Sequence, residues 1–311
     1  MTDRTPLVTA TKRGLYCPPG DFYIDPAKAV QTAVVTHAHG DHLREGSSRL
    51  FMAVPGVGIA RKRLKDARNV VPVEYGTSFT LGSVSLSLHP AGHILGSAQV
   101  RLEHEGQVWV VSGDYKRQLD PTCAPFQPLE CDVFVSETTF GQPHFVWPET
   151  YGVVGNIVRW WQINRERGHN SVLFCYALGK AQRVLAEMLH HTRETVHVHG
   201  EIGTLVEVYR NAGIDMVPTV PVTATSARRT AGRTGHGHTD HESFFLVATP
   251  GTGYPGILFG VDAAGGGEPA ARLRYGIRGV RPCRLARAGR HLPGESGRPH
   301  STHARPHRSA G

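Results

Sequence analysis

The stretch VVTHAHGDH, residues 34–42, places the strongest constraint on what this chain can fold into. It holds three histidines and an aspartate within six residues, directly after an apolar run. Imidazole nitrogens and carboxylate oxygens are ligands that zinc takes in proteins, and two metals ~3.5–4 Å apart can share a water that becomes nucleophilic at neutral pH. The pattern HxHxDH therefore favours two neighbouring metal positions over a solvated histidine-rich loop.

Strand and helix patterns alternate before about residue 220. Runs rich in β-branched and aromatic residues, bounded by Gly, Pro or Asp, predict strands over Phe22–Asp25, Ala33–Thr36, Val84–Leu88, Gln107–Ser112, Val133–Ser136 and Ser171–Tyr176. Apolar residues at helical spacing predict a helix over Lys180–His190. This alternation indicates an α/β sandwich.

The composition excludes several other classes of protein. A chain of 311 residues that is 40% hydrophobic can form about two domains. No apolar stretch reaches the length of a signal peptide or a membrane span, which predicts a cytoplasmic protein without a membrane partner. The five cysteines are scattered and form no CxxC pair, so neither a disulfide framework nor a cysteine zinc site is expected.

The HxHxDH loop resembles the signature of the metallo-β-lactamase superfamily, and three further segments resemble that family in the same order. They are FYID, AGHILGSAQ and SGDYK, which end at or contain Asp25, His93 and Asp114. The resemblance implies that Asp25 supports the ligand loop and that two divalent ions, zinc or alternatively manganese, are bound. It implies that one metal is held by His37, His39 and His93, the other by Asp41 and His42, and both by Asp114.

The flanking segments AGHILGSAQV, SGDYKRQLDPTCAPF and SETTFG are similar to those of the β-CASP nucleases, and YALGKAQR to bacterial ligase-associated DNA exonucleases and mRNA 3′-end processing factors. The resemblance covers roughly residues 10 to 222. It implies a nuclease acting on DNA or RNA, exonucleolytic and linked to DNA repair and to a DNA ligase. Asp41, Asp114 and Glu137 are then the expected catalytic carboxylates, although Glu137 in Ser-Glu-Thr fits a helix cap equally well.

The same resemblance implies a domain organisation. A four-layer αββα metallo-β-lactamase sandwich is expected over residues 1–140, followed by an inserted, incomplete β-CASP cap over residues 141–224. In the cap, Lys180 and Arg183 at i and i+3 are candidates for phosphate contacts, and a solvated helix face is the alternative. Trp160 and Trp161 fit a helix core better than a base-stacking surface. His89 is assigned a structural role rather than a ligand role, and His199 is assigned a structural role unless the site is short of ligands, in which case it is a candidate ligand.

The chain changes character near residue 225. Residues 221–311 contain 13 arginines, no lysine and five acidic residues, so the whole excess charge of +8 lies there. The family pattern also requires two histidines, in segments like SDHADWP and THG, and neither segment is present. VRPCRLA (280–286) and HARP (303–306) have permitted codons that, shifted by one base, encode SDHADW and THG. We therefore interpret residues 225–311 as a frameshift-derived, non-native or disordered tail.

The expected activity is phosphodiester hydrolysis, impaired in this chain because one metal ligand and the general acid are missing. A small-molecule metallo-hydrolase of the same superfamily is one alternative, although such an enzyme needs no cap. An inactive nucleic-acid-binding remnant is a second alternative. An in-frame tail that supplies new ligands is a third.

The frameshift hypothesis predicts that the coding DNA, sequenced from codon 215 to its end, has an open shifted frame that spells SDHADWP and THG. Stop codons in that frame would show that the present tail is the native one. Reading all three frames of one independently sequenced clone decides between these results.

Overall fold

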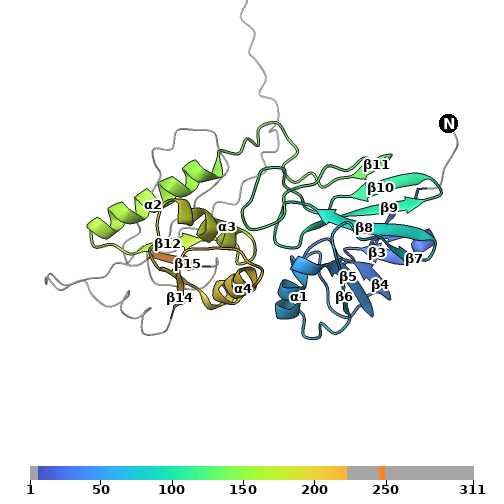
Figure 1. The fold of residues 1–311 in the computed structure, drawn as a ribbon, viewed down its shortest axis with the longest axis horizontal. Coiled ribbons are helices and arrows are strands. Elements are labelled where there is room, and N and C mark those ends of the chain that lie inside the picture. The colour runs from blue at the N-terminus through green and yellow to red at the C-terminus, as the bar shows by residue number, and fades with distance from the viewer. Residues whose placement is uncertain (1–5, 223–244, 249–311) are drawn as a thin grey trace, which may run out of the picture. The chain divides into compact units, whose positions relative to one another are not determined.

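The computed structural model describes residues 6–222 and 245–248. The elements fall into a group that ends at residue 135 and a group that begins at residue 150 (Figure 1). Apart from residues 245–248, the tail predicted over residues 225–311 lies outside the described residues.

The first group contains two β-sheets. One has six strands in chain order, which are β1 (Thr9–Thr11), β2 (Gly14–Cys17), β3 (Phe22–Ile24), β4 (Thr32–Val34), β5 (Arg49–Ala53) and β6 (Val70–Val73). The other has the spatial order β11-β10-β9-β8-β7, with β7 (Phe79–Leu81), β8 (Val84–Pro90), β9 (Ala98–His104), β10 (Gln107–Val111) and β11 (Val133–Val135). Short 3₁₀ helices, η1 (Pro18–Gly20) and η2 (Val54–Gly56), follow β2 and β5.

The two sheets enclose a shared core. Val34 of β4 packs in one buried cluster with Val84, Leu86 and Leu88 of β8. Its neighbour Ala33 packs in a different cluster, because successive side chains of a strand point to opposite faces of the sheet. The second cluster includes Ile59 and Ala60 of α1 (Val57–Arg63), so this helix covers the outer face of the six-stranded sheet. Strands buried on both faces explain the apolar run before the histidine loop.

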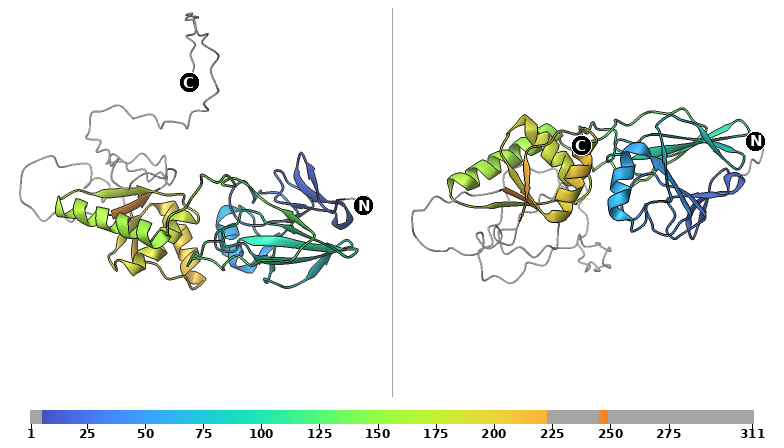
Figure 2. Two further views of the ribbon diagram at one scale, coloured as in Figure 1. Left: turned by 90° about the horizontal axis from the view of Figure 1, so that it is seen from above. Right: turned by 60° about the horizontal axis from the view of Figure 1, so that its bottom comes forward.

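The second group is a smaller α/β unit. Its parallel sheet has the order β12-β15-β13-β14, with β12 (Ser171–Phe174), β13 (Val196–Val198), β14 (Thr219–Pro221) and β15 (Phe245–Ala248). Its helices are α2 (Thr150–Glu166), α3 (Lys180–Glu187), η3 (Met188–His190) and α4 (Gly200–Asn211). Figures 1 and 2 show the long helix α2 alongside this sheet, where Trp161 is buried and Trp160 is partly buried against the same core.

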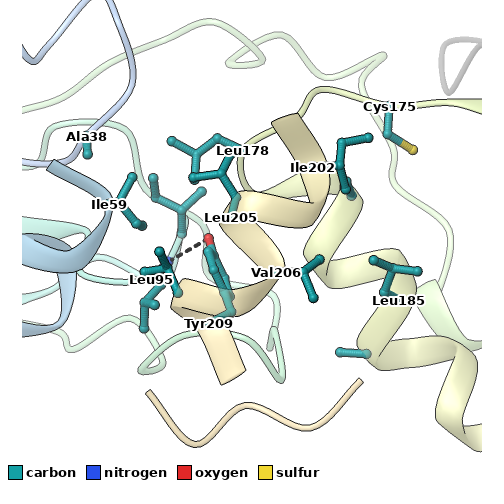
Figure 3. Close-up of a cluster of buried hydrophobic side chains, with 14 of the residues drawn as sticks. Ala38, Ile59, Leu95, Cys175, Leu178, Leu185, Ile202, Leu205, Val206 and Tyr209 are labelled. Carbon is teal, nitrogen blue, oxygen red and sulfur yellow. Dashed lines mark hydrogen bonds between the residues drawn. The ribbon is translucent and has the colours of Figure 1, made fainter. Parts of the chain in front are cut away.

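One hydrophobic cluster is shared by the two groups. Ala38, Ile59 and Leu95 of the first group belong to the same buried cluster as Leu178, Leu205 and Tyr209 of the second (Figure 3). The backbone N–H of Leu95 also donates a hydrogen bond to the Tyr209 hydroxyl, at 3.3 Å. The loops after β4 and β8, which carry the predicted ligands, are therefore packed against the second group.

The α/β class and the two facing sheets are confirmed, and all six predicted strands and the predicted helix occur. Strand β15 pairs with both β12 and β13, so the second group's sheet uses residues beyond the predicted boundary at residue 224. Within the described part of the chain, no helix has the length and apolar character that a bilayer span needs.

The close contact of two loops at Gly96 gives a stability prediction. Gly96 has a φ of +76°, and a Cβ there would lie 2.1 Å from the Gly56 nitrogen. We expect Gly96→Ala to lower the free energy of unfolding by more than about 3 kcal/mol, from left-handed strain plus overpacking. Gly76 is the matched control, because its φ is +75° with nothing within 4 Å of the added methyl. Gly76→Ala should cost only about 1–2 kcal/mol. The same decrease in unfolding free energy for Gly96→Ala and Gly76→Ala, measured by urea unfolding, would contradict this account.

Candidate metal centre

The histidine loop leaves β4 through Thr36, which is held by Asp25 at the end of β3. Asp25 accepts the backbone N–H of Thr36 at 2.7 Å and its hydroxyl at 2.5 Å. The backbone of Asp25 has a φ of +45° and its N–H donates to the Val34 carbonyl. The carboxylate of Asp25 therefore fixes the residue from which the histidine loop starts, and its role in supporting a metal site stays a prediction.

Four side chains converge at this loop. One ligand atom each from His37, His39, His93 and Asp114 lies within 4.8 Å of all the others. His37 Nε2 is 2.9 Å from His39 Nδ1, and His93 Nε2 is 3.3 Å from that same atom. Three imidazoles and a carboxylate are a donor set that suits zinc, so this cluster can bind a divalent metal.

Asp114 is shared between this cluster and a second position. Its Oδ2 lies 3.7 Å from His37 Nε2 and 3.7 Å from His93 Nε2, whereas its Oδ1 lies 3.4 Å from His42 Nε2. Asp41 reaches His42 Nε2 at 3.6 Å, and its side chain is 76% exposed. The six predicted ligands thus lie close together. One oxygen of Asp114 faces His37 and His93, and the other faces His42.

Two backbone contacts fix the loops that carry His93 and Asp114. The hydroxyl of Ser97 accepts the N–H of His93 at 3.0 Å. The N–H of Lys116 donates to the Ala91 carbonyl at 2.9 Å. Gly92 has a φ of +73°, and a Cβ there would lie 2.3 Å from the Lys116 carbonyl oxygen. The two ligand loops therefore hold each other directly.

His39 also contacts the second group of elements. Its Nε2 lies 3.3 Å from the carbonyl oxygen of Leu178. A carbonyl can only accept, so Nε2 carries the proton and Nδ1 keeps its lone pair toward the cluster. Such a bond to the second ring nitrogen orients a metal-binding histidine. Sequence reasoning missed Leu178, since a backbone carbonyl leaves no signal in the residue type.

In the metal-free site the electrostatics favour the protonation states of metal ligands at His37, His93 and Asp114, whereas His42 is protonated and must release a proton to coordinate a cation. Burial, with the neighbouring histidines, lowers the pKa of His37 far below its usual value and lowers the pKa of His93 to about 4. The hydrogen bond with His42 lowers the pKa of Asp114. For His42, burial opposes the charged form, but hydrogen bonds with Asp114 and Asp25 outweigh it and raise the pKa to about 10. Neutral His37 and His93 beside an ionised Asp114 are ready to coordinate a cation.

Glu137 follows β11 at the edge that carries Asp114, because β10 and β11 are parallel. Its carboxylate accepts the N–H of Thr139 at 2.7 Å, and its own N–H contacts the Ser112 hydroxyl at 3.4 Å. Glu137 is not among the four clustered ligand residues. In this structure it binds a turn rather than the start of a helix, since the next described helix begins at Thr150, and its catalytic role stays a prediction.

The two basic candidates differ in their surroundings. Lys180 is exposed, with its ammonium 5.3 Å from the ring centre of Tyr176. Arg183 donates to Gln118, the Leu119 carbonyl and Thr150. The guanidinium of Arg183 is therefore committed to protein acceptors.

The two histidines assigned structural roles lie outside the four-residue cluster. His89 contacts Ser87 at 2.9 Å and Gln127 at 3.2 Å. His199 is the residue preceding α4. Neither position changes the predicted ligand set.

The lowered pKa of His93 predicts a pH effect in the metal-free protein. Unfolded His93 gains a proton below about pH 6.5 while folded His93 stays neutral down to about 4, so stability falls as pH falls through this window. The contribution of His93 should approach about 1.4 kcal/mol per pH unit. This contribution is measured by urea unfolding in the presence of a chelator at pH 7, 6 and 5. It is the difference between the wild type and His93→Gln in the slope of unfolding free energy against pH. Parallel slopes for the two proteins would contradict the assignment.

No family model matches the sequence. A protein named probable DNA ligase, from Opitutus terrae, is 32% identical over 208 residues, which are 66% of this chain and 20% of that protein. A ribonuclease from Thermus thermophilus is 30% identical over 198 residues, or 55% of this chain and 45% of its own length. An endoribonuclease from Gibberella zeae is 25% identical over 179 residues, or 53% of this chain and 19% of its own.

The chain spans less than half the length of each of these curated relatives. Two of the three are named for cleaving RNA and one for joining DNA, and they come from bacteria and a fungus. Each of them is similar to this chain over part of its own length, and over these residues the chain is similar to nucleases of the metallo-β-lactamase and β-CASP type.

Proposed function

We propose that this protein is a metal-dependent nuclease that hydrolyses phosphodiester bonds of DNA or RNA. The observation that carries the proposal is the division of Asp114 between two sets of ligand groups, with Oδ2 toward His37 and His93 and Oδ1 toward His42. A carboxylate in this position suits two divalent ions, and the histidine-rich donor set favours zinc, with manganese as the alternative. One ion would be held by His37, His39, His93 and Asp114, the other by Asp41, His42 and Asp114.

Ions held there would supply activation of the attacking water and neutralisation of the charge on the phosphate. The protein's own residues prepare the site for this. The lowered pKa values of His37 and His93 keep both imidazoles neutral, so each ring has a nitrogen lone pair that can bind a metal. Asp41, the most exposed of the six ligand residues, is the carboxylate that substrate and solvent can reach. Glu137, at the same edge of the sheet, would position the group that acts on the leaving oxygen.

The relatives bear on the substrate without fixing it. The match to a protein named as a DNA ligase supports an exonuclease linked to DNA repair, with a DNA ligase as a functional partner. The ribonuclease and endoribonuclease support RNA as the alternative substrate. Either substrate favours a cytoplasmic location. A small-molecule hydrolase of the same superfamily is less favoured, since the second group of elements packs directly on the ligand loops.

The activity of this chain should be weak, because the two segments that carry the family's C-terminal histidines, SDHADWP and THG, are absent from its sequence. We expect slow hydrolysis of bis(p-nitrophenyl) phosphate and of a labelled oligonucleotide in Mn²⁺ or Zn²⁺, and none in excess chelator. Asp41→Ala should lower the rate at least about 100-fold, because a metal ligand is lost. Asp66→Ala is the matched control, since Asp66 is an exposed aspartate paired only with Arg68.

The outcomes separate the candidate functions. Metal-dependent cleavage of the oligonucleotide that Asp41→Ala abolishes and Asp66→Ala preserves supports the nuclease. Hydrolysis of thioesters or lactams without oligonucleotide cleavage favours the small-molecule hydrolase. Oligonucleotide binding with no turnover in any metal favours the inactive remnant.

A further inference from the structure

Asp120 is a buried carboxylate to which the proposed chemistry assigns no role. Its side chain is 4% exposed. Oδ1 accepts the N–H of Thr122 at 2.9 Å and its hydroxyl at 2.6 Å. Oδ2 accepts a hydrogen bond from the ammonium of Lys116 at 2.5 Å, and it forms an ion pair without a hydrogen bond with Nε of Arg183 at 3.5 Å. A buried charge needs this much compensation, so Asp120 depends on two cations from different parts of the chain.

Arg183 brings the second group of elements to this carboxylate. It lies on α3, and its Nη2 donates to the side-chain oxygen of Gln118 at 3.3 Å, to the carbonyl of Leu119 at 3.4 Å, and to the hydroxyl of Thr150. Nη2 carries two protons, so these three acceptors share them. The loop that follows Asp114 therefore surrounds the Arg183 side chain.

Lys116 connects this network to the candidate metal centre. It lies two residues after Asp114, its ammonium pairs with Asp120, and its N–H donates to the Ala91 carbonyl. Its carbonyl oxygen packs on Gly92, the residue before His93. A shift of Lys116 would therefore displace the loops of two proposed ligands together.

The same segment of the second group touches the ligands at another point. Leu178, five residues before Arg183, offers its carbonyl oxygen to His39 at 3.3 Å. Residues 178–183 thus contact the candidate metal centre at two points, which are the proposed ligand His39 and the loop that follows Asp114. Two contacts from one short segment therefore restrain the loop of His39 and the loop of Asp114 together.

We propose that Asp120 and Arg183 are positioning residues for the metal centre, acting through Lys116 on the Asp114 loop. The proposal rests on the metal binding in the proposed function, but not on its substrate. It assigns Arg183 to the centre's geometry instead of to a phosphate contact. A purely structural ion pair would affect folding and leave metal affinity and metal spectra unchanged.

The test compares Arg183→Gln, Arg183→Lys and Arg165→Gln in the full chain. Arg165 is the matched control, because it pairs with Glu194 within the second group of elements. The measurements are Co²⁺ affinity by competition with a chelator, the visible absorption spectrum of the Co²⁺ protein, and urea unfolding of the metal-free proteins. Arg183→Gln should bind Co²⁺ about 10–100-fold more weakly, with an altered spectrum. Arg183→Lys should recover part of the affinity, since an ammonium can still pair with Asp120.

The proposal is overturned if Arg183→Gln binds Co²⁺ as tightly as Arg165→Gln with the same spectrum, or if the wild type binds no Co²⁺. If Arg183→Gln does not fold, Asp120→Asn, which keeps the shape of the side chain, is judged by the same criteria. Tight Co²⁺ binding in the wild type, weak binding in Arg183→Gln and no hydrolysis of any phosphodiester would support the positioning role while overturning the proposed function.

Discussion

The candidate site depends on one carboxylate that does not belong to the ligand cluster. Asp25 ends the third strand in a left-handed conformation, and its two oxygens receive the backbone N–H of Thr36, the hydroxyl of Thr36 and the ring of His42. Three interactions with one group tie the end of β3 to the start and the end of the histidine loop. The loop that carries three of the closely packed imidazoles is thereby held by bonds to a carboxylate outside the ligand cluster.

The sequence predicted the parts of the site that follow from local pattern. The strand before the histidine loop is recognisable because its residues are buried on both faces. The spacing of His37, His39, Asp41 and His42 predicts their convergence, since they lie on one short loop. His93 and Asp114 come from different strands, and only the family resemblance connected them with that loop.

What the sequence could not predict is decided by tertiary contacts. Lys180 and Arg183 look alike in a helix pattern, yet one is exposed and the other is bound to protein acceptors. Helix α1 was not predicted, because seven residues, three of them basic at its end, give almost no periodic signal. Asp120 carries a hint in its Asp-Pro-Thr turn, but its pairing with α3 depends on a residue 63 positions later.

The strand order β12-β15-β13-β14 has a consequence for how this protein is made. Strands β12 and β13 follow each other in the chain but do not pair, because β15 lies between them. Until residues 245–248 emerge from the ribosome, the sheet exists as one lone strand and one pair, each with an unsatisfied edge facing the gap. Open edges of this kind recruit strands from other chains. The last strand of the described residues thus closes the sheet, and we expect the nascent protein to be most vulnerable to aggregation just before this strand emerges.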